Sequence, residues 1–386
     1  MLIEPLNTAL PTLHERLVQM PAVNYSDPLW TMLERLLVAH APSGGANLLG
    51  AIGDDIAVLA DELELRDRAI PHLGSTGNTA IWLGTDKPAA DLVLVAHMDR
   101  PSFRVRALGT GALYPICANR FPPGDYHVPA KAVRFERGRL VVGAEGMLVS
   151  RKEGGEESLR FEARHGTLAW HDTVLMDVHP AFANDTVIGS GLDNSLGVLT
   201  ALLTAAVLRG IESVMRERDR RCLFVFTDQE EGPPEAFFGH GAARLTHALP
   251  PPTYGCVVVD AHTAGPELIP QPGSGVSHSP ASGWGRGSVV PPNYHALAVD
   301  LAEAINAVRP GTVQMNTGHL SRSDDVALSR WTRILGLSGP PMTDPHTGRE
   351  SARLADVQSG VWWLTHFVPV VLNLVPELTP RYALGR

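Results

Sequence analysis

The sequence predicts an α/β protein with a mixed sheet flanked by helices and a small all-β domain inserted into it. Short apolar runs at 91–97, 221–227 and 254–260 are typical of strands buried on both faces. Apolar stretches with helical spacing alternate with these runs. Between 101 and 185 the pattern changes to short alternating segments divided by glycines, which indicates a barrel or sandwich. We therefore expect a first domain formed by residues 1–100 and 186–386, interrupted by a β-rich domain at 101–185.

The elements of the first domain follow in order. PLWTMLERLLVAH at 28–40 has the spacing of an amphipathic helix, and APSGG after it predicts a turn. IGSGLDNSLG predicts a glycine-bounded turn before a long apolar helix at about 195–209. Further expected elements are strands at 221–227, 254–260 and 332–338 and a helix at 296–308.

Composition narrows the class of protein. The chain has 386 residues, of which 44% are hydrophobic and 19% charged, which is ordinary for a folded globular protein. A net charge of -9 argues against nucleic acid or an anionic membrane surface as the main partner. Three cysteines (Cys117, Cys222 and Cys256) do not form a paired framework, and two of them lie in apolar runs.

The sequence also predicts the cellular compartment of the protein. The first residues, MLIEPLNTALPTLHERL, lack a basic region followed by an apolar stretch, so we expect no signal peptide. No uncharged apolar segment reaches about 18 residues, so we expect no membrane span. The cytoplasm, where thiols stay reduced, is the expected setting.

Side chains that bind metals follow three of the apolar runs. The run at 91–97 ends at His97 with Asp99 after it, the second is followed by Glu230 and Glu231, and the third by Asp260. In an open parallel sheet, ligands bind beyond the carboxyl ends of the strands, so these side chains should meet. Two more candidates are Asp193, in the glycine-rich turn before a helix, and His346, in the proline-rich loop GPPMTDPHTGRE.

This set of ligands favours two metal ions over one. Two histidines with three or four carboxylates do not suit a structural zinc, which prefers a closed cysteine and histidine shell. They suit two divalent ions that share a bridging carboxylate and a hydroxide. The adjacent Glu230 and Glu231 then have separate tasks, one as a metal ligand and the other as the acceptor of the water proton. Each segment alone has an ordinary alternative, such as a solvated turn or a helix cap.

Six segments resemble the M42 family of metallo-aminopeptidases, which includes glutamyl aminopeptidase and the TET-like peptidases. They are APSGG, VAHMD (95–99), GSGLDNSLG (189–197), TDQEEG (227–232), VVVDAHT (257–263) and DPHTGRE (344–350). They span most of the chain in the family's order. The β-rich region also falls where that family carries its PDZ-like domain. HTGRE is similar to the related M18 aspartyl aminopeptidases, so M42 and M18 both stay open at the level of the subfamily.

The resemblance implies a role for each candidate. His97 and Asp260 would bind one metal ion, Glu231 and His346 the other, and Asp193 would bridge the two. Glu230 would be the general base for a water held between the ions. Asp99 would be the carboxylate that orients the His97 imidazole. Zinc is the expected metal, with cobalt and manganese as alternatives.

The sequence departs from the M42 pattern at three places. Arg100-Pro101 stands where M42 members usually have an acidic residue, PPEAFFGH lengthens the segment after EEG, and Asn-Ser follows Asp193. None of these removes a ligand. His240, His262 and His319 are further candidates for contact with substrate, while Asp324 and Asp325 are expected at the start of a helix.

The function that follows is a two-metal aminopeptidase acting on short peptides. An M20-like deacylase or carboxypeptidase is one alternative, although its inserted domain is usually of mixed α/β type. A non-catalytic binding or scaffold protein is the other. The expected partners are peptide substrate and further copies of the chain, from a dimer up to a dodecamer.

Overall fold

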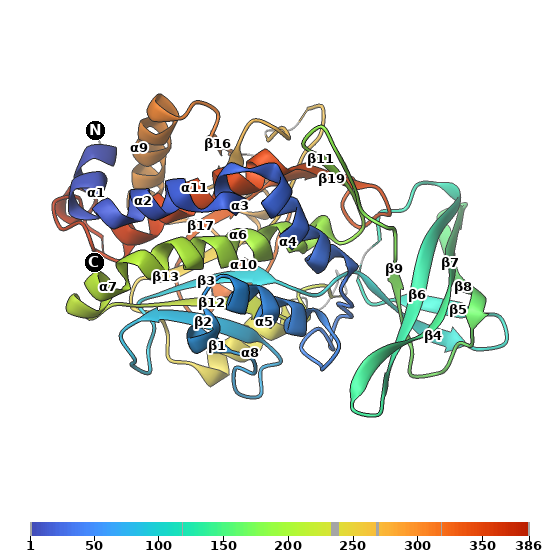
Figure 1. The fold of residues 1–386 in the computed structure, drawn as a ribbon. Coiled ribbons are helices and arrows are strands. Elements are labelled where there is room, and N and C mark those ends of the chain that lie inside the picture. The colour runs from blue at the N-terminus through green and yellow to red at the C-terminus, as the bar shows by residue number, and fades with distance from the viewer. Residues whose placement is uncertain (1, 118, 233–238, 268–269, 318, 385–386) are drawn as a thin grey trace.

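The computed structural model describes residues 2–117, 119–232, 239–267, 270–317 and 319–384. Its centre is an eight-stranded mixed sheet in the order β1-β2-β12-β3-β13-β17-β15-β16 (Figure 1). The strands, in that order, are Ala69–Ile70, Thr79–Gly84, Arg221–Thr227, Leu92–His97, Gly255–Val259, Ile334–Gly339, Val276–Ser279 and Val313–Met315. β12, β3, β13 and β17 are parallel neighbours. The expected mixed α/β sheet is therefore confirmed.

Strands β3, β12 and β13 are apolar on both faces because helices cover both sides of the sheet. All six residues of β3 and all five of β13 are buried. Figure 1 shows α2, α3, α4, α6 and α11 gathered on one side of the sheet. The helices are α1 (Ile3–Ala9), α2 (Pro11–Gln19), α3 (Pro21–Asn24), α4 (Ser26–Val38), α5 (Ile52–Glu62), α6 (Leu192–Leu208), α7 (Glu212–Glu217), α8 (His240–Ala248), α9 (Pro292–Val308), α10 (Asp325–Leu328), α11 (Leu354–Val371) and α12 (Thr379–Tyr382).

The all-β region forms a closed barrel that stands at one end of the molecule (Figure 1). Its strands, in spatial order, are β4 (Ser102–Ala107), β5 (Ala112–Pro115), β8 (Glu156–Gly166), β7 (Arg139–Glu153), β6 (Gly124–Glu136) and β9 (Thr173–Met176). Phe103, Leu148, Phe161 and Val174 belong to its separate apolar core. Closure leaves the barrel without a free strand edge. The domain limits at 100 and 185 stay a prediction.

A second, five-stranded sheet joins the carboxyl-terminal end of the inserted region to late segments of the chain. Its order is β10 (Ala181–Ala183), β11 (Thr186–Gly189), β19 (Glu350–Arg353), β18 (Pro341–Thr343) and β14 (His262–Thr263). The loop between β18 and β19 contains His346. This sheet therefore places a residue from late in the chain beside the segment that leads into α6.

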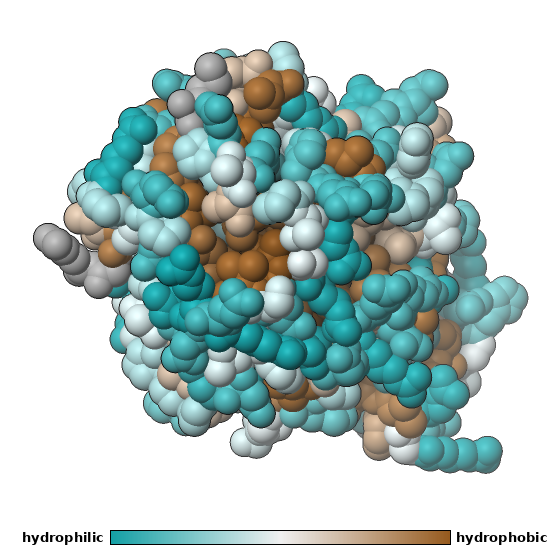
Figure 2. Space-filling view, turned by 60° about the vertical axis from the view of Figure 1, so that its left-hand side comes forward, coloured by the Kyte–Doolittle hydropathy of each residue, from teal (hydrophilic) through white to brown (hydrophobic). Residues whose placement is uncertain are grey.

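Helix α6 forms the centre of the apolar core. Among the described residues, the stretch Leu192–Glu217 has the length and composition of a membrane span, but 78% of its most apolar window is buried inside the protein. It packs against α11, α4 and β3. We therefore interpret it as a core helix. The outer surface is mainly polar on the face drawn in Figure 2, with a hollow of hydrophobic residues near its centre.

A buried histidine gives the core a specific sensitivity to acid. His278 lies on β15 with none of its surface exposed, and its Nδ1 is 2.7 Å from the Ser338 hydroxyl oxygen. Its ring packs against Trp363 and Phe367. Burial lowers the pKa of His278 to about 3. The folded protein therefore holds this imidazole neutral at pH values where an exposed histidine is charged.

We predict that His278 makes the free energy of unfolding fall as the pH drops below about 6.5. The unfolded chain takes up a proton at that ordinary histidine pKa, whereas the folded chain does not, so acid favours unfolding. At pH 4.5 the free energy of unfolding should be about 2–3 kcal/mol lower than at pH 7 because of this residue. Urea unfolding at pH 7 and pH 4.5, with a chelator present, measures it. His278→Asn should lose this part of the pH dependence. His247→Asn, at an exposed position, should keep it, and an unchanged slope in His278→Asn would contradict the prediction.

Candidate metal centre

Three parallel strands bring five of the candidate side chains to one edge of the sheet. β12 pairs with β3 so that Thr227 lies opposite His97, and β13 pairs with β3 on its other side. Glu230 and Glu231 follow β12, and Asp260 follows β13, at the same carboxyl edge. The parallel register therefore produces the convergence that the strand ends predicted.

The other two candidates come from loops on the opposite side of this edge. Asp193 lies at the start of α6, just after Gly191, which has a φ of 84°. A Cβ at Gly191 would lie 2.2 Å from the Arg100 side chain, so only glycine fits this turn. His346 enters from the loop between β18 and β19, with a φ of 60°.

The first ligand group consists of His97, Asp193 and Asp260. His97 Nε2 lies 3.1 Å from Asp193 Oδ1 and 3.4 Å from Asp260 Oδ1. All three ligand atoms lie within 4.8 Å of one another. His97 and Asp260 are buried, with 2% and 9% of their surfaces exposed.

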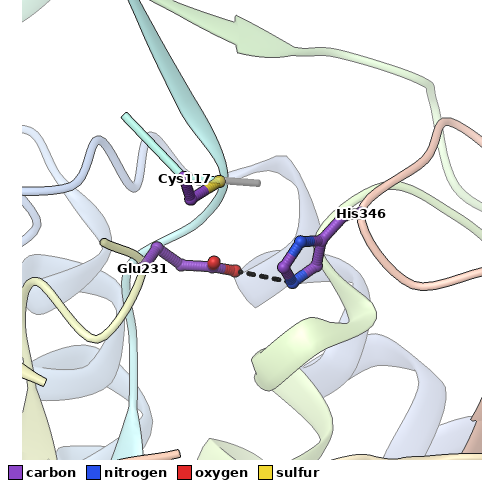
Figure 3. A group of neighbouring side chains, drawn as sticks. All are labelled: Cys117, Glu231 and His346. Atoms are coloured by element: carbon purple, nitrogen blue, oxygen red, sulfur yellow. Dashed lines mark ion pairs between the residues drawn. The ribbon is translucent and has the colours of Figure 1, made fainter. Parts of the chain in front are cut away.

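The second ligand group includes a residue that the sequence analysis did not select. His346 Nε2 lies 3.4 Å from Asp193 Oδ2 and 3.4 Å from Glu231 Oε1. The sulfur of Cys117 lies within 4.8 Å of the Glu231 and His346 ligand atoms. Figure 3 shows the Cys117 sulfur, the Glu231 carboxylate and the His346 ring converging from three separate segments.

The geometry and burial of both groups fit divalent ions. Ligand atoms about 2.1 Å from a tetrahedral ion lie about 3.4 Å apart, close to the distances between the histidine nitrogens and the carboxylate oxygens of both groups. Glu231 Oε1 and Asp260 Oδ1 are buried without a hydrogen bond among the described residues. A buried carboxylate oxygen left without a partner is costly, and a cation at each position would remove that cost.

The electrostatics of the centre also reflect an excess of buried carboxylates. Burial raises the pKa of Glu230 well above its ordinary value and raises the pKa of Glu231 to about 7. Burial alone would lower the pKa of His97, but Glu230 and Asp260 outweigh it and raise that pKa. Burial and then Glu231 raise the pKa of the Cys117 thiol. Added positive charge would therefore stabilise this cluster.

The centre opens into a cleft of about 250 Å³. His97, Asp193, Glu230, Glu231, Asp260 and His346 all line it, together with Cys117, Arg120, Gly232, Ala261, Leu320, Ser321 and Arg322. Glu230 faces the cleft, with its Oε2 4.0 Å from His97 Nε2. A small polar substrate could therefore reach the carboxylates and both histidines.

Asp99 fixes the backbone of the glutamate pair. Its Oδ1 accepts a hydrogen bond of 3.0 Å from the Glu230 N–H, and its Oδ2 accepts one of 3.2 Å from the Glu231 N–H. His97 Nδ1 is 3.7 Å from Asp99 Oδ1 and 3.2 Å from the Asp99 carbonyl oxygen. The expected orienting role toward His97 stays a prediction, while the contact with the glutamate pair is an addition from the structure.

Two buried side chains that had no role in the sequence analysis position the loops. Asn194 donates to the Val259 carbonyl at 2.9 Å and accepts hydrogen bonds from Gly197 and Ala261 at 3.0 and 3.2 Å. It therefore ties the residue after Asp193 to both neighbours of Asp260. Only the LDN segment marked this position in the sequence.

Glu350 connects the Asp193 and His346 loops. Its Oε2 accepts hydrogen bonds from the Leu192 and Asp193 backbone N–H groups at 2.7 and 3.4 Å, and its Oε1 accepts one from His346 at 3.0 Å. It is completely buried. The HTGRE segment contained this residue, but nothing in the sequence indicated which backbone groups it contacts.

Arg100 points away from the metal centre, which explains its presence beside Asp99. Its guanidinium donates to the Leu36, Leu37 and Ala39 carbonyl oxygens at the end of α4. A cation is favourable at the carboxyl end of a helix. This departure from the M42 pattern therefore supports α4 and removes nothing from the cleft.

The remaining candidates from the sequence, three histidines and two aspartates, lie at different places in the fold. The rings of His262 and His319 stack with centroids 3.8 Å apart, and His262 Nδ1 is 2.6 Å from the Ser277 hydroxyl oxygen. His240 is exposed at the start of α8. Helix α10 begins at Asp325 as expected, but the Asp324 carboxylate accepts a hydrogen bond from Thr227 rather than capping the helix. The insertion PPEAFFGH lies mostly outside the described residues.

Comparison with solved structures identifies the fold. A TET aminopeptidase from the marine sediment archaeon Thaumarchaeota archaeon SCGC AB-539-E09 has a TM-score of 0.71 at 14% identity, over 91% of this chain and 99% of that one. The TET1 peptidase of Pyrococcus horikoshii, which assembles into a tetrahedron or a large octahedral shell, has a TM-score of 0.64 at 17% identity, over 87% and 98%. A structure from Thermotoga maritima titled an endoglucanase has a TM-score of 0.61 at 19% identity, over 89% and 98%.

No protein-family model matches the sequence, and no curated protein does. The chain thus has the fold of the TET aminopeptidases, as its resemblance to M42 implied. Structures described as an aminopeptidase and as an endoglucanase share that fold, so the fold alone does not determine the activity of this chain.

We predict that Asn194→Ala lowers both stability and metal affinity. Three buried backbone groups lose their partner, which should cost about 2–4 kcal/mol of the free energy of unfolding, and Asp193 and Asp260 lose their common brace. Asn306→Ala is the matched control, because Asn306 also makes three hydrogen bonds to backbone groups, at Thr312 and Val313. Both variants should lose stability in urea, but only Asn194→Ala should bind zinc more weakly. Equal zinc affinity in the two variants would contradict the bracing role.

Proposed function

We propose that the chain is a two-metal aminopeptidase of the M42 kind that removes N-terminal residues from short peptides. The observation that carries the proposal is the position of Asp193 between two histidines. Its two oxygens lie 3.1 Å from His97 Nε2 and 3.4 Å from His346 Nε2. A carboxylate shared by two histidine-containing groups suits a pair of divalent ions. His97 and Asp260 would hold one ion, and Glu231 and His346 the other.

The residues of the chain then divide the chemistry among them. When bound, the ions would polarise the scissile carbonyl and lower the pKa of the attacking water. Glu230 accepts the proton of that water and returns it to the leaving amine. Its high pKa in a buried acidic cluster suits a group that must both accept and release a proton. The acidic cleft attracts the positively charged N-terminus of a peptide.

Three features favour this function over the alternatives. The inserted domain is a closed barrel, whereas an M20-like deacylase or carboxypeptidase usually carries a mixed α/β unit there. A non-catalytic scaffold has no need for Glu230 in the cleft next to a complete set of ligands. A glycosidase would need two carboxylates flanking a sugar, but here histidines alternate with the acids.

The metals, assembly and location follow the same reasoning. Histidine and carboxylate ligands accept zinc, and also cobalt or manganese. We propose a homo-oligomer, a dimer up to a dodecamer, because TET1 of P. horikoshii forms closed shells on this fold. The three cysteines are free and buried, which suits the reducing cytoplasm. With a net charge of -9, peptides are more suitable partners than nucleic acid or a membrane surface.

We predict that Glu230→Gln abolishes peptide hydrolysis while both metal ions stay bound. Glutamine keeps the shape of the side chain but accepts no proton, so turnover should fall by at least about 10²–10⁴-fold. Metal content by mass spectrometry and turnover of a free peptide measure both effects. The control is Asp356→Asn, a buried carboxylate that accepts hydrogen bonds from Gly273 and Gly275 and should leave turnover unchanged. Near-full activity in Glu230→Gln would rule out this mechanism.

A mixed pool of free and N-acetylated peptides should distinguish the candidate functions. We expect stepwise shortening of the free peptides from their N-termini, no reaction of the acetylated ones, and loss of activity in a chelator with recovery on adding zinc. Mass spectrometry of the pool gives the order of removal and therefore the preferred residue. Release of acetyl groups or of C-terminal residues would favour the M20-like function, and an unchanged pool would favour a non-catalytic role.

A further inference from the structure

We propose that Cys117 is a thiolate ligand of the second metal position, together with Glu231 and His346. The inference rests on the proposed two-metal centre and adds a ligand to it. The sulfur lies within 4.8 Å of both the Glu231 and the His346 ligand atoms, and Figure 3 shows the three side chains pointing toward one region. Cys117 also lines the cleft, so its sulfur lies at the surface that an entering ion reaches.

A second observation, independent of the cysteine, indicates an ion at this place. Glu231 is 97% buried, with 3% of its surface exposed, and its Oε1 has no hydrogen bond among the described residues. That oxygen is the one 3.4 Å from His346 Nε2. A buried carboxylate oxygen that lies next to an imidazole and a thiol and makes no hydrogen bond of standard geometry is well suited to bind a cation.

The position of Cys117 also differs from that of the other two cysteines. Cys222 and Cys256 lie within β12 and β13, with none of their surfaces exposed and with apolar neighbours on their strands. Cys117 follows β5 in the inserted region and faces a carboxylate and an imidazole instead. The burial of Cys222 and Cys256 needs only packing to explain it, whereas that of Cys117 places a thiol among metal-binding groups.

The added ligand makes the two metal positions unequal. The first has His97, Asp260 and the shared Asp193, which is the three-ligand set typical of a site that leaves a place for substrate. The second has His346, Glu231, Asp193 and Cys117, which completes four protein ligands. Binding would release the thiol proton to solvent as the sulfur bonds to the ion, with no change in oxidation state. A thiolate favours zinc, cobalt and cadmium over manganese at the second position.

Cobalt loading of the full chain tests the inference without substrate. A cobalt–thiolate bond gives an intense charge-transfer absorption in the near ultraviolet that nitrogen and oxygen ligands do not give. We expect the band in the wild type and in Cys222→Ala, the matched buried cysteine, and its loss in Cys117→Ala. Competition titration should show a roughly 10–100-fold loss of zinc affinity at one position in Cys117→Ala, with a smaller change for manganese. Cys117→Ser serves in place of Cys117→Ala if the alanine variant fails to fold.

The outcomes separate this inference from the proposed function. Two bound cobalt ions without the band in the wild type would overturn the ligand role of Cys117, while peptide hydrolysis by the same sample would still support the aminopeptidase. The band persisting in Cys117→Ala would also overturn it, because another sulfur would then be the ligand. A band that depends on Cys117, in a protein that cleaves no peptide, would support the ligand and contradict the proposed function. A protein that binds no cobalt would overturn both.

Discussion

The repulsion among buried carboxylates at one edge of the sheet is the constraint on which the rest of the centre depends. Asp193, Glu230, Glu231 and Asp260 meet there, close to His97 and His346. Such a cluster persists only if the fold holds it in place and a cation compensates its charge. Burial, and after it the neighbouring carboxylates, raise the pKa values of Glu230 and Glu231. In the proposed two-metal centre, ion binding and the stability of this region would therefore be coupled.

The protein holds the cluster through backbone groups. Asp99 accepts hydrogen bonds from the backbone N–H groups of the glutamate pair. Glu350 accepts hydrogen bonds from backbone N–H groups of the Asp193 and His346 loops. Asn194 joins the first turn of α6 to the end of β13. Ser43 and Gly44 brace the loop after β12 through the Glu231 carbonyl and the Asp228 carboxylate. The proposed ligands are thus positioned by buried polar groups that are one step removed from the ion positions.

The sequence indicated which side chains gather at this edge of the sheet better than it indicated which groups support them. His97, Glu231 and Asp260 follow apolar runs, and the carboxyl ends of parallel strands share an edge, so chain order was enough to place them together. Asn194 and Arg100 were noticed only as departures from the M42 pattern, because the sequence does not state which way a side chain points after a strand or turn. Cys117 received no role from the sequence, which showed only that two of the three cysteines lie in apolar runs. Its contact with Glu231 and His346 spans more than a hundred residues and has no local signal.

The inserted barrel has a direct part in the second metal position. Besides presenting Cys117, it contacts the His346 loop through Tyr126, whose hydroxyl oxygen accepts a 3.0 Å hydrogen bond from the Gly348 N–H. A Cβ at Gly348 would lie 2.5 Å from the Val128 side chain, so the loop approaches the barrel more closely than any other residue would allow. The loop that contains His346 therefore packs against the barrel, whereas His97 and Asp260 lie at the ends of strands of the central sheet. Of the proposed ligands, Cys117 comes from the inserted region, whereas His97, Glu231 and Asp260 lie at or just after the ends of strands of the central sheet. This difference gives a physical reason for the two proposed metal positions to be unequal.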